Sequence, residues 1–230
     1  MTISQSVLGN AADNLLVARG YSQAVFIGCD LRGSSTTHPA LFAEAGSSIV
    51  LSQSHLHDVP SDGVHILDGS VLDLRDSRIS SCGGVAVLAN RGGKILLTRS
   101  AFHGFPKNVI LGEHASEVHA VDCEFWDALS AIAVTERSSA TVSGSRFHDL
   151  RGNGVFVGTT ATATVTGSTF TDSVYPAVAV IGQGSAAIVE QSLVQRCGQQ
   201  WPGILVDDEA EITLRSSRVQ DCADRVQHYS

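Results

Sequence analysis

The chain has 230 residues, of which 43% are apolar and 17% are charged, a composition that supports a packed core and excludes a disordered chain. Its formal net charge is −8, from 15 basic and 23 acidic side chains, so the protein repels phosphate backbones and we expect no nucleic-acid partner. No apolar run reaches the roughly 18 residues of a membrane span, and the first residues lack the basic and apolar regions of a signal peptide, so we expect no membrane partner either.

A short sequence unit repeats along the whole chain. It consists of alternating apolar residues, a serine, a large apolar residue, a turn, and a second short strand that often reads Gly-Val-x-Val. One clear copy is 140–147 followed by 154–157, and the next is 163–170 followed by 177–180. Most intervals between equivalent large apolar positions are 22 or 23 residues. These positions are Leu8, Leu31, Leu56, Ile79, Phe102, Phe125, Phe147, Phe170, Leu193 and Val219.

The unit alternates with a period of two and has no helical period, which predicts short strands separated by turns. One unit is too small to bury its own apolar face, whereas stacked copies cover one another. In this repeat the chain resembles the right-handed parallel β-helix superfamily of pectate lyases and related β-helix repeat proteins. The resemblance implies an all-β fold, a single-stranded right-handed parallel β-helix of about ten coils with about 23 residues in each. This fold hosts lyases, hydrolases, epimerases, isomerases and binding modules, so it does not define an activity.

In chain order, the first coil begins at once, because Ile3, Ser6 and Leu8 already match the unit. Insertions at 32–38 and 198–202 interrupt the regular spacing, and residues 221–230 read as a polar tail. We therefore expect one β-helix domain over residues 1–230. Neither end carries a recognisable polar cap, so both a module of a longer protein and an end covered by oligomerisation stay open.

Two columns of residues are predicted to face the interior. The first is apolar: Phe26, Leu51, Leu74, Leu97, Ala120, Val142, Val165, Ile188 and Leu214. The second is rich in serine: Ser6, Cys29, Ser54, Ser77, Ser100, Cys123, Ser145, Ser168, Gln191 and Ser217. Small hydroxyl side chains fit tight bends and form hydrogen bonds with the backbone there. We therefore interpret the serine column as structural and not as catalytic.

The cysteines indicate a reducing compartment. There are five, at inward positions, and none has the His/Cys spacing of a zinc site, so we expect no metal, no cofactor and a cytoplasmic location. Only Cys197 and Cys222 fall in adjacent coils, and whether they are bridged stays open. Buried free cysteines behave as small apolar residues, which is the alternative to a bridge.

The second strand of each unit is predicted to have an apolar outward face. One column contains Leu16, Phe42, His65, Ala86, Ile110, Ala133, Phe156, Ala179 and Leu205, and the next adds Leu67, Leu88 and Ile181. In pectate-lyase-like enzymes the corresponding sheet carries acidic residues, Arg or Lys that handle a charged sugar, and in this chain those residue types are nearly absent there. A stripe of this length exceeds what a monomer normally exposes, so it predicts a protein partner or a homo-oligomer. The alternative is that the chain itself buries these positions or that the alternation is misread by one residue.

A second outward face carries polar residues that could perform chemistry. Adjacent coils are predicted to bring together His103, Glu124, Trp126, Arg146 and His148. Imidazoles serve as general acids or bases near neutral pH, Arg binds carboxylates, and Trp offers a stacking surface for a sugar. The candidate catalytic residues are therefore His103, Glu124, Arg146 and His148, with Trp126 as a binding residue. The alternative is a solvated face with weak Glu–Arg pairs.

Two functions follow from these faces, and whether the protein is an enzyme stays open. The first is a non-catalytic scaffold or recognition module that binds a protein partner, or a second copy of itself, through the apolar strand face. The second is a carbohydrate-active enzyme of the lyase, epimerase or hydrolase type that uses the His/Glu/Trp/Arg patch.

Overall fold

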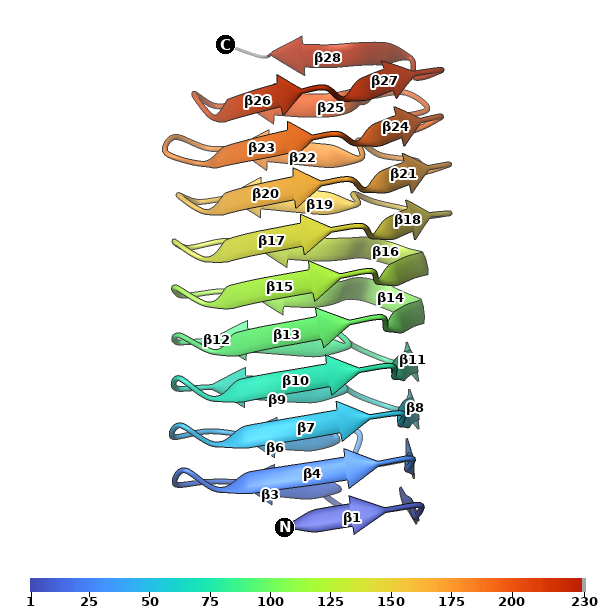
Figure 1. The fold of residues 1–230 in the computed structure, drawn as a ribbon, viewed down its shortest axis with the longest axis vertical. Coiled ribbons are helices and arrows are strands. Elements are labelled where there is room, and N and C mark those ends of the chain that lie inside the picture. Colours follow the sequence, from blue (N-terminus) through green and yellow to red (C-terminus); the bar gives the residue numbers. More distant parts are fainter. Residues whose placement is uncertain (229–230) are drawn as a thin grey trace.

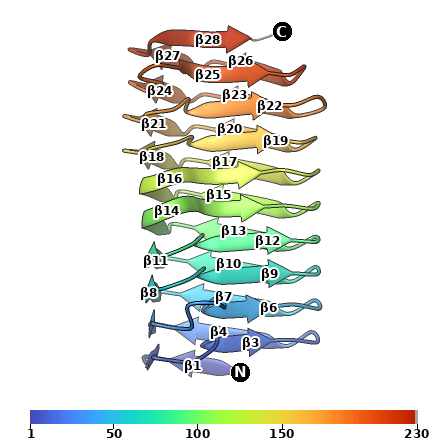
Figure 2. The same ribbon diagram turned by 180° about the vertical axis from the view of Figure 1, so that it is seen from behind.

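The computed structural model describes residues 1–228, which form a right-handed parallel β-helix with no helix. The chain winds through about ten coils stacked along one axis, from β1 at one end to β28 at the other (Figure 1). Each complete coil contributes three strand segments, and the third lies on the opposite side of the stack from the first, nearer the viewer in Figure 2. Each strand pairs in parallel with its equivalent in the next coil. The predicted fold class is therefore confirmed.

Face A is the ten-stranded sheet formed by the first strand of each coil. Its strands are β1 (Thr2–Ser4), β4 (Gln23–Ile27), β7 (Ser48–Ser52), β10 (Val71–Arg75), β13 (Lys94–Thr98), β15 (Glu117–Val121), β17 (Ser139–Ser143), β20 (Thr162–Thr166), β23 (Ala186–Glu190) and β26 (Glu211–Arg215).

Faces B and C are formed by the second and third strand segments, and they join into one 18-stranded sheet because β14 (Ala101–Gly112) and β16 (Glu124–Val134) run through both. The other strands of face B are β2 (Val7–Gly9), β5 (Asp30–Arg32), β8 (His55–Val59), β11 (Arg78–Cys82), β18 (Arg146–His148), β21 (Thr169–Thr171), β24 (Leu193–Gln195) and β27 (Arg218–Gln220). The other strands of face C are β3 (Leu16–Ala18), β6 (Leu41–Ala43), β9 (Val64–Leu67), β12 (Val87–Asn90), β19 (Val155–Gly158), β22 (Val178–Ile181), β25 (Pro202–Asp207) and β28 (Asp224–His228).

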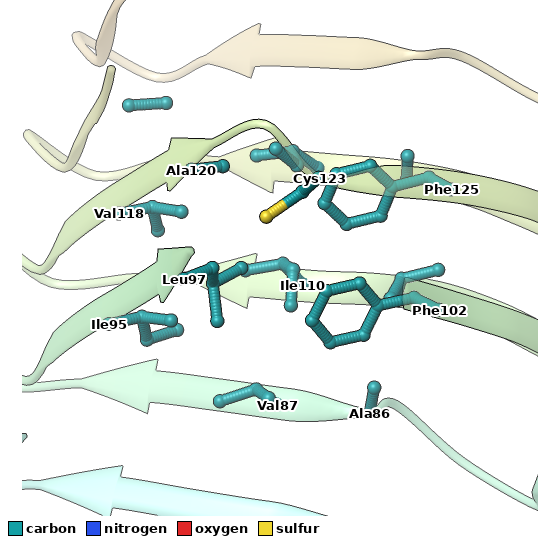
Figure 3. Packing of buried hydrophobic residues seen from close by; sticks show 14 of the residues in the cluster. Ala86, Val87, Ile95, Leu97, Phe102, Ile110, Val118, Ala120, Cys123 and Phe125 are labelled. Carbon is teal, nitrogen blue, oxygen red and sulfur yellow. The ribbon is translucent and has the colours of Figure 1, made fainter. Parts of the chain in front are cut away.

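The core is a set of columns in which like residues stack on like. Four phenylalanines on the inner side of face B form a continuous stack, with ring centroids 4.5–5.0 Å apart and planes within 8° of parallel: Phe102, Phe125, Phe147 and Phe170. Figure 3 shows Phe102 and Phe125 in adjacent coils, with Ile110 and Leu97 beside Phe102. Each ring is fully buried because the coils above and below cover it.

Each coil turns from face A to face B at a residue in the left-handed backbone conformation followed by the serine column. The turn residues include Gln53, Asp76 and Arg99, with φ between 46° and 50°. The next residue is buried, and its hydroxyl oxygen accepts a hydrogen bond from the backbone N–H of the preceding coil. Ser77 Oγ, for example, accepts from Ser54 N–H at 3.0 Å. The serine column is therefore structural, as interpreted from the sequence.

In one coil the predicted register is wrong by one residue. Val189, Ser192 and Val194 occupy the inward positions that were assigned to Ile188, Gln191 and Leu193. Ser192 Oγ accepts from Ser168 N–H at 3.1 Å, which fixes the register. Alternation could not decide it, because Ile188 and Val189 are both apolar.

The two ends of the stack are less well covered than the middle. Ile3 and Leu8 in the first coil are half-buried, and Leu214 in the last is 38% exposed. The expectation of a polar tail after residue 220 is wrong for β28, which pairs with β25 and places Val226 opposite the inward Ile204. The rest of the expected tail, residues 229–230, lies outside the described part of the chain.

Replacing Phe125 by Ala should reduce the free energy of unfolding by about 3–5 kcal/mol, because it opens a cavity in the middle of the ring stack. Thr164→Ala, at an exposed position of face A, is the matched control and should change it by less than about 0.5 kcal/mol. Denaturant unfolding measures both. Equal effects of the two variants would contradict a stability that depends on the stack.

Replacing Ser77 by Ala should cost about 1–3 kcal/mol of unfolding free energy, because the buried Ser54 N–H loses its only side-chain acceptor. Ser52→Ala changes an outward serine of face A and should be close to neutral. The same unfolding measurement distinguishes them, and a neutral Ser77→Ala would argue against the serine column as a structural device.

Candidate functional site

From β3 to β25 the outward column of face C is apolar in eight of nine coils. It contains Val17, Phe42, His65, Leu88, Leu111, Ala133, Phe156, Ala179 and Leu205. We call this set the apolar stripe. Leu67 and Ile181 lie two residues further along their strands, on the same outer side. The structure therefore brings together most of the residues predicted from the sequence.

Ile110 is a correction to the predicted stripe. It is fully buried and pairs with the inward Val87 and Ile132, so Leu111 takes the outward place (Figure 3). Leu16 and Ala86 were likewise assigned outward, but Leu16 pairs with the buried Leu41 and Ala86 is fully buried. Leu88, expected in the second column, belongs to the first. The run Val109–Leu111 is apolar throughout, so the alternation of apolar and polar residues could not show which of its side chains point inward.

Exposure along the stripe is uneven. Val17 is 43% exposed and Phe42, Leu88, Leu111 and Phe156 are partly exposed, whereas Ala133, Ala179 and Leu205 are buried. Near the first coils the stripe opens into a hollow of about 330 Å³, whose lining residues are Asn14, Val17, Arg19, Thr37, His38, Pro39, Phe42 and His65. The insertion at 32–38 thus supplies one wall of an apolar hollow.

Four exposed apolar side chains next to the stripe were missed from the sequence. Leu129, Val174, Tyr175 and Trp201 are 37–43% exposed and lie at the corner where the chain passes from face B to face C. Tyr175 and Trp201 come from adjacent coils and stack with centroids 5.7 Å apart. Only the irregular segment 198–202 pointed to this corner, because turn residues have no period from which exposure can be read.

The predicted polar patch on face B is assembled as expected. Trp126 pairs with His103 on one side and His148 on the other, and the three rings stack with centroid distances of 4.5 and 5.8 Å. Glu124 and Arg146 occupy the neighbouring outward column, and Arg146 Nη1 lies 3.9 Å from Glu124 Oε1. Because the rings are stacked along the coil axis, each face of Trp126 is turned toward a neighbouring imidazole.

His148 is held between two carboxylates. Its Nε2 lies 3.2 Å from Glu124 Oε1, and its Nδ1 lies 2.7 Å from Asp149 Oδ2. The same arrangement occurs four coils earlier, where His57 contacts Asp30 at 3.0 Å and Asp58 at 2.8 Å. This second copy was not predicted as a site. The His-Asp dipeptide common to both was the signal available in the sequence.

A basic cluster on the same face consists of His55, Arg78 and His103. Arg78 pairs in register with His55 and has no ion pair within residues 1–228. Burial, His57 and Arg78 lower the pKa of His55, and burial and Arg78 lower the pKa of His103. His55 Nε2 lies 2.9 Å from Ser80 Oγ. A groove of about 520 Å³ runs beside the cluster, and its lining includes Asp30, His55, Arg78 and Arg99.

No group of three or more His, Cys, Asp or Glu side chains in the described chain is arranged to hold a metal ion. The described residues also contain no helix that is long and apolar enough to cross a bilayer.

Comparison with known protein families matches residues 39–194, more than half of the chain, to the family described as "Right handed beta helix region". The chain belongs to this family. Comparison with curated proteins and with solved structures gives no match.

Replacing Arg78 by Gln should raise the pKa of both His55 and His103 toward the ordinary value of 6.5, because one cation that opposes their protonation is removed. NMR titration of the imidazole protons measures this. In the native protein the folded pKa of each histidine is depressed, so the unfolded chain binds more protons and stability falls as the pH drops below 6.5. The variant should lose less stability on acidification.

Arg146→Gln is the matched control, because Arg146 pairs with Glu124 and is not among the groups that shift either pKa. Unchanged titration of His55 and His103 in Arg78→Gln would contradict the predicted influence of the guanidinium.

Proposed function

We propose that this chain is a non-catalytic recognition module that binds protein through the apolar stripe of face C, and that a second copy of the chain is the partner. The observation that carries the proposal is the apolar stripe, which is apolar in eight of the nine coils from β3 to β25 on an outward face. Its partly exposed apolar members are Val17, Phe42, Leu88, Leu111 and Phe156, and exposed apolar surface marks interaction sites.

The shape and size of the face favour a flat partner. At a spacing of about 4.8 Å between coils, nine coils give a stripe about 40 Å long. Exposed corner residues such as Tyr175 and Trp201 add apolar surface to this side of the molecule, and a stable interface buries about 800 Å² per partner. A two-fold symmetric dimer brings the same surface patch of both copies together, so an outward apolar face can pack on the same face of a second copy.

The aromatic side chains supply candidate anchor points. Phe156 lies in the stripe, and Tyr175 and Trp201 lie at the adjacent corner. Large aromatic residues at the centre of an interface carry most of its binding energy. Polar pairs border the stripe, such as Arg19 with Glu44 and Asn90 with Glu113, and they resemble the polar rim of a protein interface.

The alternative, a carbohydrate-active enzyme on face B, has weaker support. A sugar stacks on an open aromatic face, whereas both faces of Trp126 are turned toward His103 and His148. Both nitrogens of His148 already have carboxylate neighbours, which leaves neither ring nitrogen directed at a substrate. The specific observation in favour of the alternative is that Glu124, Trp126, Arg146 and His148 are nevertheless adjacent.

Phe156→Asp or Leu111→Asp should weaken self-association at least tenfold, about 1.4 kcal/mol, because each introduces a charge into the middle of the stripe. Light scattering on a sizing column at two protein concentrations measures the oligomer, and circular dichroism checks that the variants fold. Thr164→Asp, outward on face A, is the control and should associate as the native chain does. A native chain that is monomeric at both concentrations would overturn the proposal of a second copy.

A further inference from the structure

Two cysteines occupy equivalent positions in adjacent coils. Strands β24 and β27 pair in register through Gln195 and Gln220, and each cysteine follows two residues later. Cys197 Sγ donates to Gln195 O at 3.5 Å, and Cys222 Sγ donates to Gln220 O at 3.3 Å. The two side chains therefore have the same orientation, one strand spacing or about 4.8 Å apart at the backbone. That separation lies within the range of about 4.4–6.8 Å between the Cα atoms of a disulfide.

The surroundings of the two sulfurs are known from burial and from the space beside Cys222. Both are free thiols in the structure. Burial raises the pKa of the Cys197 thiol, and the neighbouring Cys222 adds to the shift. Gly203 leaves the space beside Cys222 free, since a Cβ at Gly203 would lie only 2.7 Å from Cys222 Sγ.

A surface groove reaches Cys197. It has a volume of about 380 Å³, and its lining includes Cys197, Gly198 and the residues on both sides of Cys222, namely Asp221 and Ala223. Cys222 is half-buried, whereas Cys197 is 1% exposed. Cys222 is therefore the more exposed of the two thiols and the first candidate for attack by a small reagent, whereas Cys197 lines the groove.

The other three cysteines have no cysteine in register with them. Cys29 is followed in its column by Ser54, Cys123 by Ser145, and Cys82 pairs with Val59. All three are buried. They provide matched controls within the same chain.

We propose that Cys197 and Cys222 form a reversible redox site that a low-molecular-weight disulfide, such as glutathione disulfide, oxidises to an intramolecular disulfide. The Cys222 thiolate attacks one sulfur of the reagent, which forms a mixed disulfide at Cys222 and releases one glutathione thiolate. The Cys197 thiolate then attacks the Cys222 sulfur, forms the Cys197–Cys222 bond and releases the second thiolate. The two protein thiols lose two electrons and two protons in total, and glutathione disulfide gains them to become two glutathione thiols.

The consequence is a covalent link between the last two coils of the described stack. The inner residues of the last coil, among them Ile212, Leu214 and Val219, are only partly buried. This coil therefore has less apolar contact to hold it than the coils in the middle. A disulfide there would restrain its opening without changing the register. The site goes beyond the proposed recognition function and does not depend on it.

The test is incubation of the folded native chain with glutathione disulfide, alkylation of the remaining thiols, and peptide mapping by mass spectrometry. We expect one cross-linked peptide pair containing Cys197 and Cys222, which dithiothreitol removes. Amide hydrogen exchange of β26 and β27 should slow in the oxidised form. Cys29→Ser, Cys82→Ser and Cys123→Ser should give the same cross-link.

The single variants separate the two roles. Cys197→Ser should accumulate a stable glutathione adduct at Cys222, whereas Cys222→Ser should give neither adduct nor cross-link. Circular dichroism of each variant establishes that it is folded. A native chain that yields only glutathione adducts, a cross-link through Cys29, Cys82 or Cys123, or no oxidation at all would overturn the proposal.

Discussion

The structure depends on in-register parallel pairing between successive coils. No coil buries its own apolar residues, because each coil is only one strand thick along the axis. Pairing brings Phe102, Phe125, Phe147 and Phe170 into one fully buried stack. The same pairing lets each serine hydroxyl accept from a backbone N–H in the preceding coil. Apolar burial and polar satisfaction therefore require the same register, which makes that register specific.

The surface chemistry is a consequence of the same pairing. A residue type that recurs at one position of the repeat becomes a column, so a weak sequence preference is amplified into a continuous face. The apolar stripe of face C arises in this way. The ion pairs of the turns do as well, since Asp68–Arg91, Asp76–Arg99 and Asp172–Arg196 each join adjacent coils. Such exposed pairs contribute little stability individually, but they keep the outside of the turns polar.

Stacking also limits what the polar patch can do. Rings that lie one strand spacing apart along the axis turn their faces to one another, and only their edges reach solvent. In the patch of His103, Trp126 and His148, the two imidazole rings stack on the faces of Trp126 to which a sugar would bind. Histidines between carboxylates, as at His57 and His148, are oriented by their neighbours through both nitrogens. The apolar face has no comparable internal partner, and for that reason it is the stronger candidate for a binding surface.

The sequence by itself determined the class of fold, the number of coils and most of the core. A period of about 23 residues with a large apolar residue in each unit is buried by stacking the units, and the predicted large apolar column was correct at every position except Leu193, where Val194 points inward. The sequence also predicted the polar patch, because its residues lie at fixed distances from the large apolar residue of each repeat unit.

Only the tertiary structure decided the details of register and exposure. Within Val109–Leu111 and Ile188–Val189 neighbouring residues are all apolar, so alternation carries no information, and pairing with adjacent coils made Leu111 outward and Val189 inward. The exposed corner of Tyr175 and Trp201 depends on the shape of two irregular turns, which have no period. A repeat fixes what stacks on what, but where the repeat is interrupted the path of the backbone decides which side chains reach the surface.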